Sequence, residues 1–166
     1  MDRREIVLEV IESNPGIRFN EIMRITDIRN GTLSHYIKKL DDEGLIKVST
    51  TPRITRMYPI GISPEEEKIC KILSKDTPRK IILFTLEKEV VTSKEVKEFV
   101  KKSSSVVSVN LNELFEEGII EKRYDIPSNK YSLRNKDMIK GILREYYPTM
   151  REKLSENLIE MLGIRV

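Results

Sequence analysis

The chain repeats itself along its 166 residues, and this repeat constrains the fold more than any other feature. Residues 4–8 align with residues 79–83, and residues 40–46 align with residues 114–120, at offsets of 75 and 74. A third match pairs 57–60 with 130–133, slipped by one residue. A repeat of this period indicates two copies of one structural unit. A chain of this length has room for two small domains.

Each copy shows three segments with apolar residues at helical spacing, followed by two short β-prone segments. Three helices are predicted for the first copy. The first ends at Pro15, the second lies near 19–25, and the third covers about 31–43 with Asn30 as N-cap. In the second copy Thr77 as N-cap and Pro78 open the first helix, and the next lies near 93–101. The β-prone segments are 45–50 and 54–60, then 119–124 and 130–133. We expect each copy to be three helices closed by a hairpin.

Three helices with a tight turn between the second and third, closed by a β-hairpin, are the pattern of a winged helix-turn-helix domain. Residues 33–46, which read LSHYIKKLDDEGLI, resemble the third helix and following strand of the MarR/ArsR-like winged-helix regulators. The resemblance covers residues 1–62 well and 76–133 more loosely. It implies a tandem winged helix-turn-helix regulator of archaeal type, mainly α with small β-hairpin wings and a long C-terminal helix.

The expected domain organisation has four parts. These are an N-terminal DNA-reading domain at 1–62, a linker helix at 63–75, a second winged helix-turn-helix domain at 76–133 and a C-terminal helical segment at 134–166. Ser63, Pro64 and Glu66 signal the start of the linker helix. The tail carries an apolar stripe that Pro148 should interrupt. This stripe either packs on its own chain or pairs with a second copy, and we expect a homodimer.

The exposed side of the third helix in the first copy is predicted to bind duplex DNA, with the helix in the major groove and the wing on the flanking backbone or minor groove. Its side chains offer hydrogen-bond donors for base edges and cations for phosphates. The predicted DNA-binding residues are Arg29, Asn30, Thr32, Ser34, His35, Lys38, Lys39, Arg53 and Arg56. An ordinary solvated helix face is the alternative.

The two copies differ in charge over equivalent segments. Residues 29–56 hold six Lys or Arg and three Asp or Glu, a net charge of +3. Residues 103–130 hold three and five, a net charge of −2. An acidic face is a poor partner for a polyanion. We expect a structural, dimerising or partner-binding role for the second copy, while a phosphate contact by Ser104 or Ser105 stays open.

Enzymatic functions find little support in the sequence. His35 and Cys70 are the only residues of their types, which leaves no internal disulfide, no cysteine-cluster zinc site and no histidine-based acid–base pair. Cys70 is expected to pack as a small hydrophobe rather than to serve as a redox sensor. There is no glycine-rich phosphate loop, and acidic pairs such as Asp41–Asp42 are interpreted as solvated helix ends. We therefore expect no enzyme, no metal and no cofactor.

Two classes of function remain. The start lacks a signal peptide and no apolar run reaches the roughly 18 residues of a membrane helix, so a cytoplasmic protein without membrane contact is expected. The leading hypothesis is a sequence-specific, double-stranded DNA-binding transcriptional regulator. The alternative is a winged-helix interaction module that binds a transcription-machinery or chromosome-associated protein. An RNA-binding scaffold would want exposed aromatic side chains that the sequence does not offer.

Overall fold

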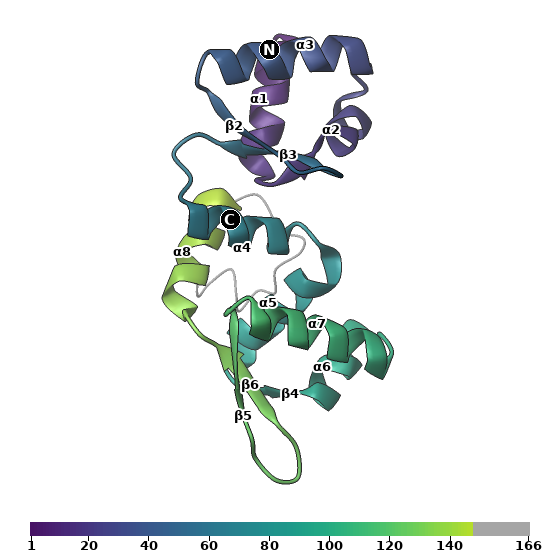
Figure 1. The fold of residues 1–166 in the computed structure, drawn as a ribbon, viewed down its shortest axis with the longest axis vertical. Helices are drawn as coiled ribbons and strands as arrows, with labels where there is room; N and C mark the ends of the chain where they lie inside the picture. The colour runs from purple at the N-terminus through teal and green to yellow at the C-terminus, as the bar shows by residue number, and fades with distance from the viewer. Residues whose placement is uncertain (148–166) are drawn as a thin grey trace. The chain divides into compact units, whose positions relative to one another are not determined.

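The computed structural model describes residues 1–147, so the predicted tail from Pro148 onward lies outside the described residues. The described chain forms two compact units (Figure 1). Unit 1 is Met1–Ser74 with Tyr146 and Tyr147, and unit 2 is Lys75–Glu145. Helices predominate and each unit contains one small antiparallel sheet, which confirms the mainly α fold class. None of the helices up to residue 147 combines the length and the apolar character that crossing a bilayer requires.

Unit 1 runs helix, strand, helix, helix, strand, strand, helix. Its elements are α1 (Arg3–Ser13), β1 (Ile17–Arg18), α2 (Phe19–Thr26), α3 (Asn30–Asp42), β2 (Ile46–Thr50), β3 (Thr55–Pro59) and α4 (Pro64–Leu73). The predicted helices and hairpin are therefore present. The predicted linker helix is α4, which belongs to unit 1 instead of standing between two domains. Its start is capped as the sequence indicates, since the Ser63 hydroxyl accepts the N–H of Glu66 at 3.1 Å.

The predicted start of α3 is wrong by one residue. Asn30 is the first helical residue and not the N-cap, a position that Arg29 occupies without a side-chain hydrogen bond. The Asn30 side chain is turned to its own helix, where its Oδ1 accepts from the Ser34 hydroxyl at 3.2 Å. The helix ends where predicted, because Gly44 at φ +71° takes up a backbone conformation that glycine adopts without strain.

The core of unit 1 surrounds α1, which contacts α2, α3 and β3. The apolar residues that recur at helical spacing in α3 face this core: Leu33, Ile37 and Leu40 are buried, and Tyr36 is half-buried. The other core residues are Val7, Ile11, Ile17, Ile22, Ile28, Ile46 and Met57. Helical spacing therefore identified the face on which α3 packs, and the opposite face is left to solvent.

The sheet of unit 1 has three strands in the order β1-β3-β2, whereas the sequence predicted only the β2–β3 hairpin. The additional strand pairs Ile17 with Met57 and Arg18 with Arg56. Two residues are too few to show the alternation by which strands are recognised in a sequence. This missed strand matters for the site, because it brings the start of α2 next to the hairpin.

Unit 2 repeats the element order of unit 1. Its elements are α5 (Asp76–Lys88), β4 (Val91–Thr92), α6 (Ser93–Val100), α7 (Ser104–Glu116), β5 (Ile120–Arg123), β6 (Lys130–Leu133) and α8 (Lys136–Tyr146). The helix α5 contacts α6, α7 and β6, the central strand of its sheet, just as α1 contacts α2, α3 and β3 in unit 1. The helix α5 begins at Asp76, so Thr77 is not its N-cap. The capping box of α6 is present, with the Thr92 hydroxyl accepting the N–H of Glu95 at 3.2 Å.

Strand register places the repeat at a constant offset of 74 from the first strand of each unit onward. Ile17 pairs with Met57 in unit 1, and Val91 pairs with Tyr131 in unit 2. Met57 and Tyr131 therefore occupy equivalent positions, and the one-residue slip of the sequence alignment is wrong. At this offset α8 is the counterpart of α4. Its predicted stripe is already buried at Ile139 and Leu143, and it ends at Tyr146, just before the predicted interruption at Pro148.

Candidate nucleic-acid interface

The exposed face of α3 carries most of the predicted DNA-binding residues. Those that are exposed are Arg29, Asn30, Thr32, Ser34, His35, Lys38 and Lys39, together with Arg53 between β2 and β3. Because residues four apart lie on one side of a helix, Asn30, Ser34 and Lys38 form one row. His35 and Lys39 form a second row beside it. Polar groups therefore mark the beginning of α3 and lysines mark its end.

Three predicted residues meet in a shallow groove of about 440 Å³ at the start of α3. Asn30 and Ser34 form its α3 side, and Arg53 with the neighbouring wing residues forms another side. The wing is held in shape by a tight turn in which the Thr51 N–H donates to the Ile54 carbonyl at 2.9 Å. Five other predicted residues lie outside this groove, on the exposed face of α3 or at its N-cap: Arg29, Thr32, His35, Lys38 and Lys39.

The groove also includes residues that the sequence did not suggest as contacts. Arg18, Phe19 and Asn20, at the start of α2, complete its lining. The Arg18 N–H and Nε both donate to Glu21, at 3.2 and 3.1 Å, yet half of the Arg18 side chain is exposed. Only the β1–β3 pairing places Arg18 beside the wing, so no local sequence signal could have shown it.

The cations of this face are weakly engaged by the protein itself. Lys38 Nζ lies 3.3 Å from a carboxylate oxygen of Asp42, and both side chains are mostly exposed. Such pairs contribute about 0 to 1 kcal/mol and are readily replaced by another anion. Within residues 1–147, Arg29, Lys39 and Arg53 form no ion pair. These charges are therefore available to an anionic ligand.

Arg56 is the exception among the predicted residues. It is 7% exposed, and its Nη1 donates to the Gly16 carbonyl at 2.8 Å and to the Ser74 hydroxyl at 2.9 Å. The helix α4 covers this side of the hairpin, where Lys47 also forms an ion pair with Glu67. Sequence alternation does not reveal this cover. Arg56 holds unit 1 together internally, and we exclude it from the candidate interface.

The equivalent helix of unit 2 presents a different surface. At offset 74, the residues in the places of Thr32, His35, Lys38 and Lys39 are Val106, Val109, Asn112 and Glu113. Val106 is 39% and Val109 is 55% exposed. Glu113 is also exposed. Apolar and acidic side chains thus replace the polar and basic ones of α3.

Unit 2 nevertheless retains a groove in the same place. It has a volume of about 300 Å³ and opens between the starts of α6 and α7. Its lining residues are Ser93, Lys94, Lys97, Ser104, Val107 and Ser108. Ser104, the phosphate contact left open by the sequence, lines this groove. The groove of unit 2 therefore differs from that of unit 1 less than the exposed helix face does.

The part of the chain that the structure describes offers few groups for a metal site or for catalysis. Among residues 1–147, no three His, Cys, Asp or Glu side chains gather as metal ligands. Cys70 is 0% exposed and lies on α4 between the buried Ile69 and Leu73. His35 is exposed on α3, and its ring centre lies 5.9 Å from that of Tyr36. The solvent-facing position predicted for His35 is therefore confirmed.

The family comparison bears on this surface. Residues 1–47 match the family model described as winged helix-turn-helix DNA-binding. This part of the chain therefore has the sequence pattern of a winged helix-turn-helix DNA-binding domain. The match includes all of α1, α2 and α3, and so confirms this part of the sequence prediction. No curated protein matches the chain.

Solved structures resemble part of the chain. The transcriptional repressor BigR from Xylella fastidiosa has 20% identity and a TM-score of 0.42, covering 48% of this chain and 83% of that one. HlyU from Vibrio cholerae N16961 has 21% identity and a TM-score of 0.43, covering 51% and 98%. NolR from Sinorhizobium fredii has 20% identity and a TM-score of 0.34, covering 61% and 88%. We base the functional proposal on the family match and on the surface of unit 1.

Proposed function

We propose that this protein is a sequence-specific, double-stranded DNA-binding transcriptional regulator in which unit 1 reads the DNA. The observation that carries the proposal is the exposed face of α3, in the domain that matches the DNA-binding family model. Side-chain donors on a helix can reach base edges in the major groove, and cations neutralise phosphates. This combination suits a duplex better than any small substrate.

In this proposal α3 lies in the major groove and the wing contacts the flanking backbone or minor groove. Arg29, Asn30, Thr32 and Ser34 contact base edges near the start of the helix. His35, Lys38, Lys39 and Arg53 contact phosphates. The groove that includes Arg18 and Asn20 accepts a phosphate, which the N–H groups at the start of α2 would also favour.

A mobility-shift titration tests this function directly. The full-length protein is titrated into mixed genomic duplex at two salt concentrations, and bound fragments are sequenced. We expect binding that weakens steeply with salt, because counterions are released at each phosphate contact. We also expect enrichment of a common sequence. Binding without sequence preference, or no binding at either salt concentration, would contradict the proposal.

Unit 2 supports a second candidate function. We propose that it is a second winged helix-turn-helix domain, since its element order repeats that of unit 1. The exposed Val106 and Val109 on α7 favour protein docking, because charged residues usually avoid the centre of a protein interface while apolar ones are common there. The partner would belong to a transcription-associated or chromosome-associated assembly. Loss of a co-purifying protein on Val109→Lys, with DNA binding retained, would support this role.

We also propose that the protein is a tandem winged-helix regulator of archaeal type and that it forms a homodimer, paired through its C-terminal segment. Because Ile139 and Leu143 of α8 are already buried in the single chain, this pairing depends on residues 148–166, outside the described residues. Sedimentation of the full chain and of a chain ending at Tyr147 tests the proposal. A dimer that becomes a monomer on shortening supports it. A shortened chain that stays dimeric would place the interface elsewhere.

A further inference from the structure

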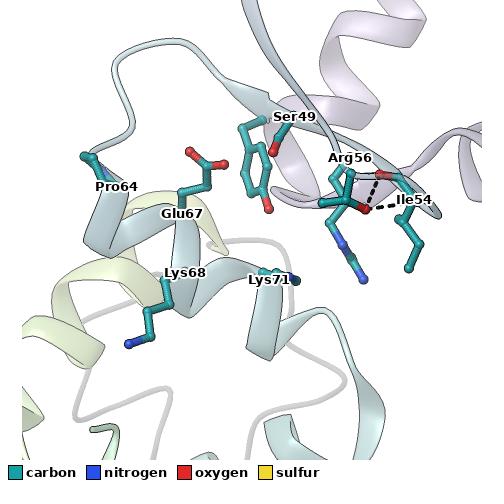
Figure 2. A pocket seen from close by; sticks show the side chains of 9 residues that line it. Ser49, Ile54, Arg56, Pro64, Glu67, Lys68 and Lys71 are labelled. Carbon is teal, nitrogen blue, oxygen red and sulfur yellow. Dashed lines mark hydrogen bonds between the residues drawn. The ribbon is translucent and has the colours of Figure 1, made fainter. Parts of the chain in front are cut away.

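A pocket of about 320 Å³ lies within unit 1 between the wing and α4 (Figure 2). Its lining residues all come from outside α3. Strand β3 and the wing form one wall, through residues that include Ile54, Arg56 and Tyr58. The helix α4 forms the other wall, through residues that include Pro64 and Lys71. Small-molecule sites have volumes from about 300 to 1,000 Å³, so this pocket suits a compact ligand.

The polar part of the pocket is a buried guanidinium with an unused donor. Arg56 is 7% exposed, and its Nη1 is satisfied by Gly16 and Ser74. Its Nε is buried and has no hydrogen-bond partner. A buried charged donor without a partner costs free energy that a bound acceptor would restore. Figure 2 shows the Lys71 side chain extending from α4 toward the Arg56 side of the pocket.

The balance of charge in the pocket favours an anion. Its acidic residue, Glu67, is engaged in an ion pair with Lys47 at the edge of the hairpin. Because Glu67 already pairs with Lys47, the positive charges of Arg56 and Lys71 in the pocket lining are available to an anionic ligand. A guanidinium matches the two oxygens of a planar carboxylate better than it matches a spherical anion, and a nearby ammonium adds a point charge.

The rest of the lining is apolar or neutral. The side chains of Ile54, Pro64 and Tyr58 can cover the body of a ligand. Burial and the nearby Glu67 carboxylate raise the pKa of Tyr58 to about 12. Its hydroxyl is protonated at neutral pH, as a tyrosine with the ordinary pKa also is, and can donate a hydrogen bond to a ligand. A ligand with an anionic end and a short apolar body would contact both kinds of wall.

We propose that this pocket binds a small organic carboxylate, with the carboxylate between Arg56 and Lys71 and the apolar body against Tyr58, Ile54 and Pro64. The site belongs to unit 1 alone. At the same register positions unit 2 has Lys130 and Ser132 in place of Arg56 and Tyr58. The proposal goes beyond DNA binding and does not depend on it.

Calorimetric titration of the full-length protein with benzoate, phenylacetate and hexanoate tests the site. Benzamide serves as the neutral analogue of benzoate, and inorganic phosphate serves as an anion without an apolar body. We expect saturable binding of at least one carboxylate and no measurable binding of benzamide. Lys71→Met should weaken the carboxylate at least about tenfold, because a charge-assisted hydrogen bond is lost. Lys71 is exposed, so this change leaves the core of unit 1 intact.

The control variant is Arg24→Met, which removes an exposed cation of the same unit outside the pocket and outside the predicted DNA-binding residues, and should leave carboxylate affinity unchanged. Three outcomes of the carboxylate and benzamide titrations would overturn the proposal. They are no saturable binding of any of the three carboxylates, equal binding of benzamide and benzoate, and equal affinity of the wild type and Lys71→Met. Phosphate binding as tightly as the carboxylates would also overturn it, because the pocket would then hold any anion.

Discussion

Units 1 and 2 have the same element order and the same central helix contacts, yet their exposed third helices differ in chemistry. Buried Leu40 in α3 corresponds to buried Leu114 in α7. On the outer face, Lys39 corresponds to Glu113 and His35 to Val109. The core pattern therefore determines the shared fold, while the exposed positions determine function independently of it. We use this contrast to assign DNA reading to unit 1.

The largest expected effect comes from the matched core changes Leu40→Ala and Leu114→Ala. Each removes a fully buried leucine and should destabilise its own unit by about 2 to 5 kcal/mol. Denaturant unfolding measures the loss, and a mobility shift at low temperature measures DNA binding. We expect DNA binding to be lost with Leu40→Ala and retained with Leu114→Ala. Equal loss in both variants would show that reading requires the two units together.

The second effect concerns Tyr58, which unit 2 replaces with Ser132. Burial raises the pKa of Tyr58 to about 12, above the ordinary value of 10.0, so the folded state holds the phenolic proton more tightly than the unfolded state. The contribution of this pKa shift to the free energy of unfolding is fully present below pH 10 and is lost as the pH rises through 12. The loss should reach roughly 2 to 3 kcal/mol, at about 1.4 kcal/mol per pKa unit.

Urea unfolding of the wild type and of Tyr58→Phe, followed across this alkaline range, measures the difference. The wild type should lose its stability advantage over Tyr58→Phe as the pH approaches 12. Parallel curves for the two proteins would mean that Tyr58 does not titrate differently in the folded state, and that its environment is more hydrated than the structure indicates.

The third effect removes equal numbers of cations from the two units. The double variant Lys39→Ala, Arg53→Ala should weaken duplex binding roughly 10- to 30-fold and lower the salt slope by about 1.8, from two lost phosphate contacts. The double variant Lys94→Ala, Lys97→Ala in the groove of unit 2 is the matched control. Fluorescence anisotropy at several salt concentrations measures both. A larger loss in the unit 2 variant would reverse our assignment.

A fourth effect adds charge to unit 2. Replacing Glu113 and Glu116 with lysine converts the acidic end of α7 into a basic one. We expect a severalfold increase in non-specific duplex binding, because the added cations attract phosphates regardless of sequence. The preferred site should not change, which selection from a random duplex library would show. A new preferred site would indicate that α7 already contacts base edges.

The smallest effect concerns two glycines within helices, of which Gly31 is exposed and Gly141 is half-buried. A Cβ at Gly31 in α3 or at Gly141 in α8 would meet nothing within 4 Å. Either glycine-to-alanine change should stabilise its helix by about 0.5 to 1 kcal/mol. Only Gly31→Ala should also weaken DNA binding, because its methyl group would lie where the backbone of α3 approaches the duplex. Unchanged affinity in Gly31→Ala would show that the start of α3 stays away from the DNA.

The sequence predicted most of the fold because the core repeats with clear periodicity. Leu33, Ile37 and Leu40 alone identify the inner face of α3, and Gly44 marks its end. The two-residue strands β1 and β4 could not be predicted, since pairing partners distant in the sequence create them. The similarity of α8 to α4 was also missed, because it is visible only after the strand register fixes the offset at 74.

The sequence predicted correctly which positions of α3 are exposed, but it predicted only part of the candidate site outside α3. The exposed positions of Asn30 and Ser34 follow from helical phase, and the structure agrees. Arg56 was assigned to the surface because the strand pattern does not reveal that α4 covers the hairpin. Arg18 was overlooked for the complementary reason, since only the β1–β3 pairing places it beside the wing. Both errors concern contacts between segments far apart in the sequence.

The most direct test of the central claim uses two serines at equivalent positions. Ser34 and Ser108 are both exposed, and each lines the groove of its own unit. The preferred duplex sequence would be selected from a randomised library with the wild type, Ser34→Ala and Ser108→Ala. If unit 1 reads the DNA, Ser34→Ala changes the preference at one or two base positions and Ser108→Ala leaves it unchanged. A changed preference in Ser108→Ala with none in Ser34→Ala would contradict the account.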